Sequence, residues 1–286
     1  MRNRPENQIE TQTEIRLTLI RHGATLSNKE GRYLGKTDEA LSPEEIGMLK
    51  KAVTGGNYPA AGLLFSGPMK RCLETAQILY PGQVTILIPE WTEMDFGVFE
   101  GHNYKELSGD PDYQKWIDSG GTLPFPEGES REEFIRRSVA GYEKMLYQVQ
   151  TIWERSAAFG QNYRNTGWGE PELEERDESQ TWNAGIPNVL MQNTDMKNTE
   201  RKNTETKNTE TKNTGIRSVS AVVHGGTIMA LLSHFLGGEY FDYQVKCGQG
   251  YSGRLMFPAG GGAPEWKEFR PLSEGTVQEL AKGVTW

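Results

Sequence analysis

The chain has few cysteines and no long apolar run. Cys72 and Cys247 are the only cysteines among 286 residues, too few for a disulfide framework and not spaced like the CxxC motif of zinc sites. We interpret both as buried thiols. No stretch approaches the ~20 apolar residues that cross a bilayer, and residues 1–16 lack the apolar segment of a secretion signal. The sequence therefore predicts a soluble, cytoplasmic protein without a membrane partner.

Positive charge is in deficit. The chain has 31 Lys and Arg residues against 39 Asp and Glu residues, a formal net charge of -8. Because nucleic acids are held by clustered Lys and Arg, we expect no nucleic-acid partner, and an anionic small molecule would need a local basic pocket. A metal-dependent reaction is disfavoured, since no pair of carboxylates has recognisable metal-ligand spacing with a histidine. We expect neither a metal nor another cofactor.

Four short apolar runs each end in a polar or glycine-containing loop, and helical patterns lie between them. The first run precedes Arg21-His22-Gly23, and the last precedes His224-Gly225-Gly226. Such alternation predicts an α/β fold, a three-layer α/β/α sandwich with a mostly parallel central sheet, which binds ligands at the carboxyl ends of its strands. The expected strands cover residues 17–20, 62–65, 84–88 and 219–223, and the expected helices cover residues 43–53, 69–79, 129–153 and 227–236.

Residues 155–215 break this pattern. They contain a five-residue repeat, Lys197-Asn198-Thr199-Glu200-Arg201 and its near copies, which fits neither a helix nor a strand. Polar segments of this kind bury too little apolar surface to offset the entropy of ordering, so we predict a largely disordered insertion. Alternatively, the segment is a docking region that uses its two tryptophans. The sequence thus predicts a polar N-terminal extension, residues 1–16, and a single domain formed by residues 17–154 and 216–286 on either side of the insertion.

Four motifs follow one another at or after the ends of the predicted strands. They are Leu19-Ile20-Arg21-His22-Gly23, Arg71, Glu93 before Phe96-Gly97, and His224-Gly225-Gly226. In this order they resemble the histidine phosphatase superfamily, which includes cofactor-dependent phosphoglycerate mutases and α-ribazole phosphatases. Further segments are most similar to the α-ribazole phosphatases and related bacterial broad-range phosphatases: Gly35, Asp38 and Leu41, Phe99-Glu100-Gly101, and Pro126-Glu127-Gly128-Glu129-Ser130.

This resemblance implies a phosphomonoesterase that acts on a small phosphate ester through a phosphohistidine. A neutral imidazole is a suitable nucleophile for a dianionic ester, and the resemblance assigns that role to His22. Arg21 and Arg71 would grip the phosphoryl oxygens with planar, permanently charged guanidinium groups. His224 would donate to the transferring phosphoryl group, and the absence of a side chain at Gly225 would let the backbone approach it.

The resemblance also assigns Asn28 to the phosphate pocket and Glu93 to proton transfer. Glu93 would protonate the leaving oxygen and then deprotonate the attacking water. Such a group works best with a pKa raised toward neutrality. Trp91 and Phe96 favour that shift by desolvation, whereas the arginines oppose it. The sequence leaves this balance open.

Two other activities remain open. A phosphoglycerate mutase must also hold a substrate carboxylate, and this chain has Met94, Phe96 and Tyr104 where mutases carry basic or hydroxyl groups, although Lys105 lies one place further on. Lys36 also stands where mutases carry tryptophan. Hydrolysis is therefore favoured, with α-ribazole 5′-phosphate as one candidate substrate. The alternative from another class is a non-catalytic phosphate-binding or scaffolding module with the insertion as its interaction arm.

Overall fold

The computed structural model describes residues 13–165, 217–258 and 261–272, with side chains to residue 154 in the first range. The chain divides into two units, Met1–Met145 with Gly215–Trp286, and Leu146–Thr214. Residues 1–12 and 166–215, on which the predicted extension and insertion largely fall, lie outside the described residues. The division into one domain with an insertion therefore stays a prediction.

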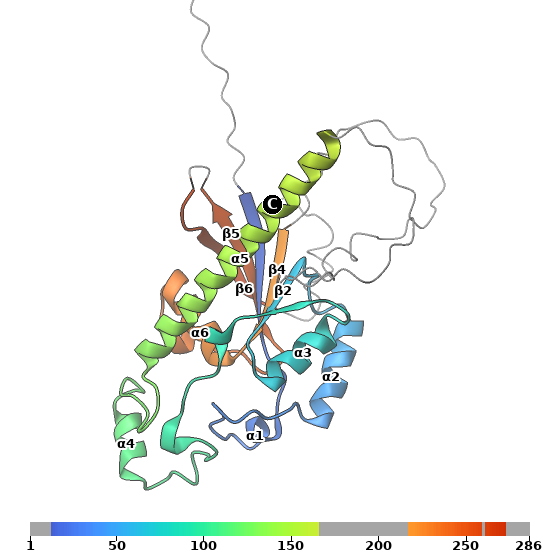
Figure 1. Ribbon diagram of the computed structural model, residues 1–286. Helices are drawn as coiled ribbons and strands as arrows, with labels where there is room; N and C mark the ends of the chain where they lie inside the picture. Colours follow the sequence, from blue (N-terminus) through green and yellow to red (C-terminus); the bar gives the residue numbers. More distant parts are fainter. Residues whose placement is uncertain (1–12, 166–216, 259–260, 273–286) are drawn as a thin grey trace, which may run out of the picture. The chain divides into compact units, whose positions relative to one another are not determined.

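A six-stranded sheet forms the centre of the first unit (Figure 1). The strand order is β3-β2-β4-β1-β5-β6, in which the first four strands are parallel and the last two are antiparallel to their neighbours. The predicted mostly parallel α/β sheet is thus confirmed. The strands are β1 Thr13–Arg21, β2 Leu63–Ser66, β3 Thr85–Leu87, β4 Arg217–Val223, β5 Gly250–Phe257 and β6 Glu265–Pro271.

Helices cover both faces of the sheet, as predicted for a three-layer sandwich. Successive side chains of a strand point to opposite faces. Ile20, Leu64 and Val222 pack in one cluster with residues of α2 and α3, whereas α6 contacts β1 from the other face. The helices are α1 Leu26–Lys29, α2 Pro43–Thr54, α3 Lys70–Leu79, α4 Pro111–Asp118, α5 Arg131–Asn165 and α6 Gly225–Leu236, with single 3₁₀ turns at η1 Pro89–Trp91, η2 Gly97–Phe99 and η4 Tyr240–Tyr243.

Local sequence explains where several helices begin. The Ser42 hydroxyl accepts a hydrogen bond from the Glu45 amide, and Pro43 occupies the first turn of α2. Asp110 caps α4 in the same way before Pro111. Side-chain caps and first-turn prolines satisfy or remove backbone donors that the first turn leaves free.

Two predicted boundaries differ from the structure by four residues or more. Strand β1 begins at Thr13 rather than residue 17, because Ile15 pairs with both Arg217 and Leu255 and is buried. Helix α5 continues to Asn165, beyond the expected end at residue 153. Its sequence contains no proline from Arg131 to Asn165 that would stop it.

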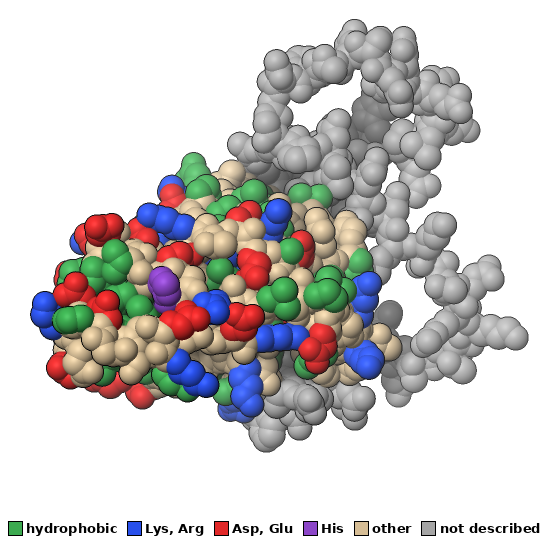
Figure 2. All heavy atoms as spheres, turned by 90° about the horizontal axis from the view of Figure 1, so that it is seen from below, with side chains coloured by type: hydrophobic (Ala, Val, Ile, Leu, Met, Phe, Trp, Pro, Cys, Tyr) green, Lys and Arg blue, Asp and Glu red, His purple; other side chains and the backbone are tan. Residues whose placement is uncertain are grey.

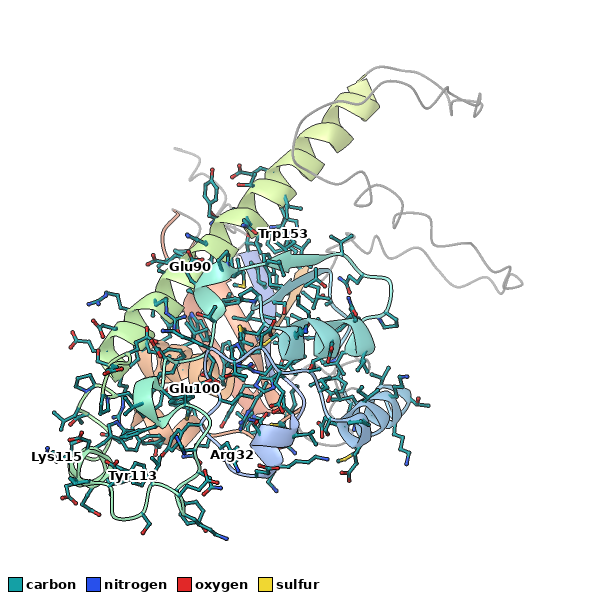
Figure 3. All side chains as sticks on the ribbon, turned by 60° about the horizontal axis from the view of Figure 1, so that its bottom comes forward. Arg32, Glu90, Glu100, Tyr113, Lys115 and Trp153 are labelled. Atoms are coloured by element: carbon teal, nitrogen blue, oxygen red, sulfur yellow. The ribbon has the colours of Figure 1, made fainter. Side chains whose placement is uncertain are left out.

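A second apolar cluster lies beyond the sheet, where the segment that connects β3 to α5 packs against residues of α5, α6 and η4. Its aromatic rings meet mostly edge to face, the arrangement that aromatic pairs prefer over face-to-face stacking. Glu100 lies among the loops at the strand ends, whereas Tyr113 and Lys115 lie farther out on α4 (Figure 3). The buried members are Met94, Phe99, Leu107, Phe125, Phe134, Ala230 and Tyr240. We call this cluster the lid core.

The surface on the side of α1 and α4 mixes acidic and basic side chains, with apolar ones between them (Figure 2). Of the helices in the described part of the chain, none combines the length and apolar character needed to span a membrane.

Candidate active site

The predicted site residues come from loops at the carboxyl ends of neighbouring parallel strands. His22 directly follows β1, His224 follows β4, and Arg71 lies in the first turn of α3, after β2. Glu93 follows the 3₁₀ turn after β3. Since β2, β4 and β1 are adjacent and parallel, these ends meet at one edge of the sheet. Residues about 200 positions apart in the sequence thereby share one site.

His22 is buried and neutral. Its Nδ1 lies 2.7 Å from the carbonyl oxygen of Gly23, and because a carbonyl only accepts, Nδ1 carries the proton and Nε2 keeps its lone pair. Burial, followed by repulsion from Arg71, lowers the pKa of His22 well below its usual value of 6.5. The imidazole is therefore held in the form that can act as a nucleophile at Nε2.

His224 lies beside His22 at the start of α6. The two ring centroids are 5.1 Å apart and the rings meet edge to face. Burial, followed by the neighbouring His22, lowers the pKa of His224 well below 6.5. Its Nδ1 is 3.6 Å from the Glu93 carboxylate, and its Nε2 is 3.6 Å from the Cys72 thiol. As the N-cap residue of α6, it lies where the helix dipole favours an anion.

Two guanidinium groups give the site its positive charge. Arg21 donates to the carbonyl of Val245, 2.7 Å away. Arg71, which is fully buried, donates to the carbonyls of Thr37 and Gly35 at 2.9 and 3.0 Å. The buried Nε of each arginine has no hydrogen-bond partner among the described residues. Two buried donors without acceptors are what an anionic ligand would satisfy.

Glu93 is the acidic group of the site. Burial raises its pKa above the usual 4.5, although the amide of Met94 and the charges of Arg71 and Arg21 act in the opposite direction. Burial is the largest of these effects, which decides the balance that the sequence left open. The carboxyl also accepts from the Met94 amide at 3.0 Å. Burial thus favours the protonated form of Glu93.

Gly225 lies beside Arg21 in the site, whereas Asn28 has a local role in α1. A Cβ atom at Gly225 would lie 3.1 Å from Nε of Arg21, so a side chain there would crowd the guanidinium. The Asn28 oxygen accepts from the Thr25 amide and closes the short helix α1. Among the described residues, Asn28 forms hydrogen bonds with Thr25 and Cys247 and none with His22 or either arginine, so its place in a phosphate pocket stays a prediction.

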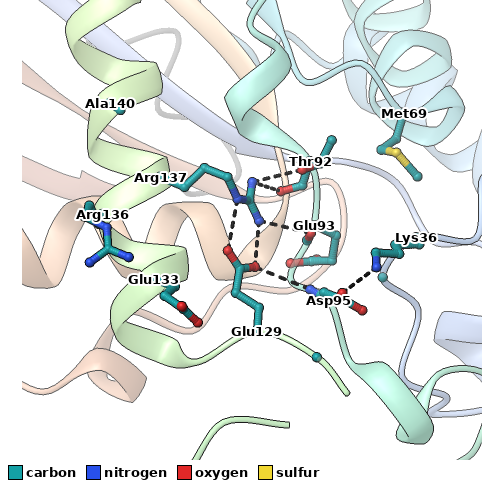
Figure 4. A pocket seen from close by; sticks show the side chains of 12 residues that line it. Lys36, Met69, Thr92, Glu93, Asp95, Glu129, Glu133, Arg136, Arg137 and Ala140 are labelled. Atoms are coloured by element: carbon teal, nitrogen blue, oxygen red, sulfur yellow. Dashed lines mark hydrogen bonds and ion pairs between the residues drawn. The ribbon is translucent and has the colours of Figure 1, made fainter. Parts of the chain in front are cut away.

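A cavity of about 870 Å³ lies beside Glu93 (Figure 4). Seven of its lining side chains are ionisable, and none is aromatic. Lys36 and Asp95 form an ion pair across it at 2.5 Å. A ligand that contacts Glu93 could extend into this cavity. The lining residues are Gly35, Lys36, Met69, Thr92, Glu93, Asp95, Gly128, Glu129, Glu133, Arg136, Arg137 and Ala140.

His22, Glu93 and His224 also present ligand atoms within 4.8 Å of one another, close enough to hold a metal ion. Charge opposes such an ion, because Arg21 and Arg71 both act on His22 and on Glu93. A dication would be repelled by the same field that attracts a phosphate dianion. The group is therefore better suited to an anion.

Three residues that support the site were missed or given no role in the sequence. Thr75 accepts from the Gly23 amide at 2.9 Å and donates to the Arg71 carbonyl at 2.6 Å. The Glu100 carboxylate binds the loop that holds Arg71, and Arg137 binds the segment that carries Glu93. Polar residues of this kind are common on helix surfaces and in loops, so no sequence signal separates them from solvated ones.

Comparisons with known proteins agree with this geometry. Residues 17–151, just under half of the chain, match the model of the histidine phosphatase superfamily (branch 1), and this part of the chain is similar to that superfamily. A bifunctional protein of Mycobacterium tuberculosis is 28% identical over 149 residues, which are 49% of this chain and 40% of that protein. The adenosylcobalamin/alpha-ribazole phosphatase of Salmonella typhimurium is 28% identical over 127 residues, which are 43% of this chain and 63% of that enzyme.

The chain thus spans less than two thirds of the length of these curated relatives. Among solved structures, the alpha-ribazole phosphatase from Shigella flexneri superposes with a TM-score of 0.53 at 17% identity, covering 91% of this chain and 96% of that one. At this identity the similarity establishes a shared fold.

Proposed function

We propose that this chain hydrolyses phosphate monoesters through a phosphohistidine at His22. The observation that carries the proposal is a buried, neutral imidazole with a free Nε2 lone pair beside the buried, unpartnered Nε atoms of Arg21 and Arg71. This arrangement offers a nucleophile and an anion site together.

In the first step, Nε2 of His22 attacks phosphorus and the ester P–O bond breaks. The protonated carboxyl of Glu93 gives its proton to the departing oxygen, so the alcohol leaves neutral. Arg21, Arg71 and His224 stabilise the phosphoryl oxygens during the transfer. In the second step, the Glu93 carboxylate takes a proton from water, whose oxygen attacks phosphorus while the P–N bond breaks. Inorganic phosphate leaves, and His22 and Glu93 return to their initial states.

Hydrolysis is favoured over mutase-type transfer by the surroundings of Glu93. Met94 is buried in the lid core, and Phe96 packs against Tyr33 and Phe125. Neither side chain can hold a substrate carboxylate. Among the cations that line the cavity, Lys36 is paired with Asp95 and Arg137 with Glu129, which leaves the exposed Arg136 of α5 as the remaining one. A mutase needs such a contact to keep its intermediate bound while the phosphoryl group is returned.

The similarity to the Salmonella typhimurium enzyme makes α-ribazole 5′-phosphate a substrate to test early. The charged cavity lining suits the polar ribosyl part of that ester better than its aromatic base. The cytoplasmic location and the single catalytic domain of 17–154 and 216–286 belong to the same proposal.

The test uses the full-length chain with p-nitrophenyl phosphate, α-ribazole 5′-phosphate and 3-phosphoglycerate, and separates released phosphate from relocated phosphate. We expect phosphate release, and acid-labile label on the protein after a rapid quench with radiolabelled ester. His22→Ala should abolish both. His102→Ala is the matched control, because His102 is exposed and pairs with Glu106 away from the site.

Full turnover in His22→Ala would refute the mechanism. Phosphate binding without turnover in the unmodified chain would instead support the non-catalytic module. Return of the phosphoryl group to a second hydroxyl of 3-phosphoglycerate would support the mutase.

A further inference from the structure

Arg137 of α5 makes hydrogen bonds along the segment that carries Glu93 (Figure 4). Its Nη1 donates to the carbonyl of Glu90 at 2.5 Å, and to the carbonyl and hydroxyl of Thr92 at 3.1 and 2.9 Å. Its Nη2 donates to the carbonyl of Glu93 at 3.3 Å. The Glu129 carboxylate accepts two further hydrogen bonds, from Nε at 3.1 Å and from Nη2 at 2.8 Å.

These contacts leave Arg137 little capacity to bind a ligand. Each of its three guanidinium nitrogens already donates to the protein, and two of them share one carboxylate. This differs from Arg21 and Arg71, whose Nε atoms are unpartnered. Arg137 therefore acts on the chain and not on the phosphate.

We infer that Arg137 is a positioning residue for Glu93, which fixes the proton donor relative to the phosphoryl group on His22. The inference rests on the proposed function. Four acceptors, on Glu90, Thr92 and Glu93, are held by one planar group, and Glu129 orients that group. A rigid fork of this kind is specific to arginine, because a lysine ammonium is a single point of donation.

Arg137 also adds positive charge near Glu93. Its charge lowers the pKa of that carboxyl, against the larger raising effect of burial. Loss of the charge should therefore raise the pKa of Glu93, whereas a lysine at the same place should largely preserve it. Geometry and charge can thus be separated by two substitutions.

Proton donation matters most when the departing oxygen is a poor leaving group. An alkyl phosphate needs the proton from Glu93 as its P–O bond breaks, whereas p-nitrophenolate leaves without it. The ratio kcat/KM follows the steps up to loss of the leaving group, so it isolates this first transfer. A misplaced Glu93 therefore affects alkyl esters selectively, while general damage to the fold affects both esters alike.

The experiment compares Arg137→Met and Arg137→Lys with the unmodified chain on an alkyl phosphate and on p-nitrophenyl phosphate. For Arg137→Met we expect kcat/KM to fall about 10- to 100-fold with the alkyl ester and less than about 3-fold with the aryl ester. A general acid supplies a rate gain of ~100-fold or more, and a misplaced Glu93 would lose part of that gain. The alkaline limb of its pH profile should move to higher pH. Arg137→Lys should show the same selectivity without that movement.

Lys144→Met is the matched control. Lys144 also lies on α5 and pairs with Glu90, but through the Glu90 side chain and in an exposed position. It should leave the ratio between the two esters unchanged.

Equal losses on both esters in Arg137→Lys, with unaltered pH limbs in Arg137→Met, would overturn the inference. If Arg137→Met does not fold, the ester selectivity of Arg137→Lys still decides. A failure of the proposed function is distinguishable, because the unmodified chain would then show no His22-dependent turnover of either ester.

Discussion

Glu100 provides a test of how the site holds Arg71. Its carboxylate accepts from the Gly35 amide at 2.9 and 3.0 Å and from the Thr37 amide at 3.0 Å. The carbonyls of Gly35 and Thr37 in turn accept from Arg71. The amides of the loop from Gly35 to Thr37 are therefore held by the Glu100 carboxylate, while its carbonyls bind the Arg71 guanidinium. In Glu100→Gln, the side-chain amide keeps one acceptor and presents N–H groups to the remaining amide.

The magnitude follows from the number of bonds lost. One of two charged amide contacts disappears, and a hydrogen bond to a charged group contributes about 1.5–3 kcal/mol. Water replaces part of it, because Glu100 is only partly buried. If the whole of about 2 kcal/mol were lost from the binding free energy of phosphate at Arg71, the affinity for phosphate would fall about 30-fold. We expect the inhibition constant for inorganic phosphate to rise between about 3-fold and this limit.

The assay measures competitive inhibition by phosphate alongside thermal unfolding. Glu44→Gln is the control, because Glu44 forms an exposed ion pair with Lys29 and should change neither quantity. An unchanged inhibition constant in Glu100→Gln, with a lowered unfolding temperature, would show that the loop stabilises the fold without positioning Arg71. That result would refute the reasoning.

Two further predictions concern protons and metal ions. The pH profile of kcat/KM should be bell-shaped. Activity falls at acid pH as His22 is protonated, in a limb that the lowered pKa of His22 places well below pH 6.5, and it falls again at higher pH as Glu93, whose pKa burial raises, loses its proton. Glu93→Gln should lower kcat/KM by roughly 100-fold and remove the alkaline limb; an alkaline limb that persists there would assign it to another group. EDTA should leave turnover unchanged, because Arg21 and Arg71 oppose a dication at His22, Glu93 and His224. If EDTA abolishes activity and added Zn²⁺ or Mg²⁺ restores it, this prediction is wrong.

The sequence was informative wherever an apolar run led directly into a functional loop. The runs before His22 and His224 form β1 and β4, which pair in parallel, so their loops had to meet. The β5–β6 hairpin was missed because β6 is largely exposed and β5 contains glycines at positions 250 and 253, which weakens the strand pattern. Both glycines are required by space: a Cβ at Gly250 would lie 2.0 Å from the Leu19 carbonyl oxygen.

The roles of Arg137 and Glu100 were beyond sequence reasoning for a different reason. Both act through backbone atoms of distant loops, and a backbone acceptor leaves no trace in residue identity. Arg71 was found as a candidate ligand, yet two of its donors are used by carbonyls of residues 35 and 37. Spacing identifies the charged groups of such a site, but not which of their donors remain available.

Burial resolves an apparent conflict within the site. The proposed reaction needs His22 without its extra proton and Glu93 with one, side by side and near the same two arginines. Positive charge alone would lower both pKa values. That keeps His22 neutral, as the reaction needs, but it would also deprotonate Glu93. Desolvation disfavours the charged form of each group, so it lowers the pKa of His22 and raises that of Glu93 at once. The site therefore depends on the exclusion of water as much as on its charged residues, and a substitution that admits water should impair both proton states together.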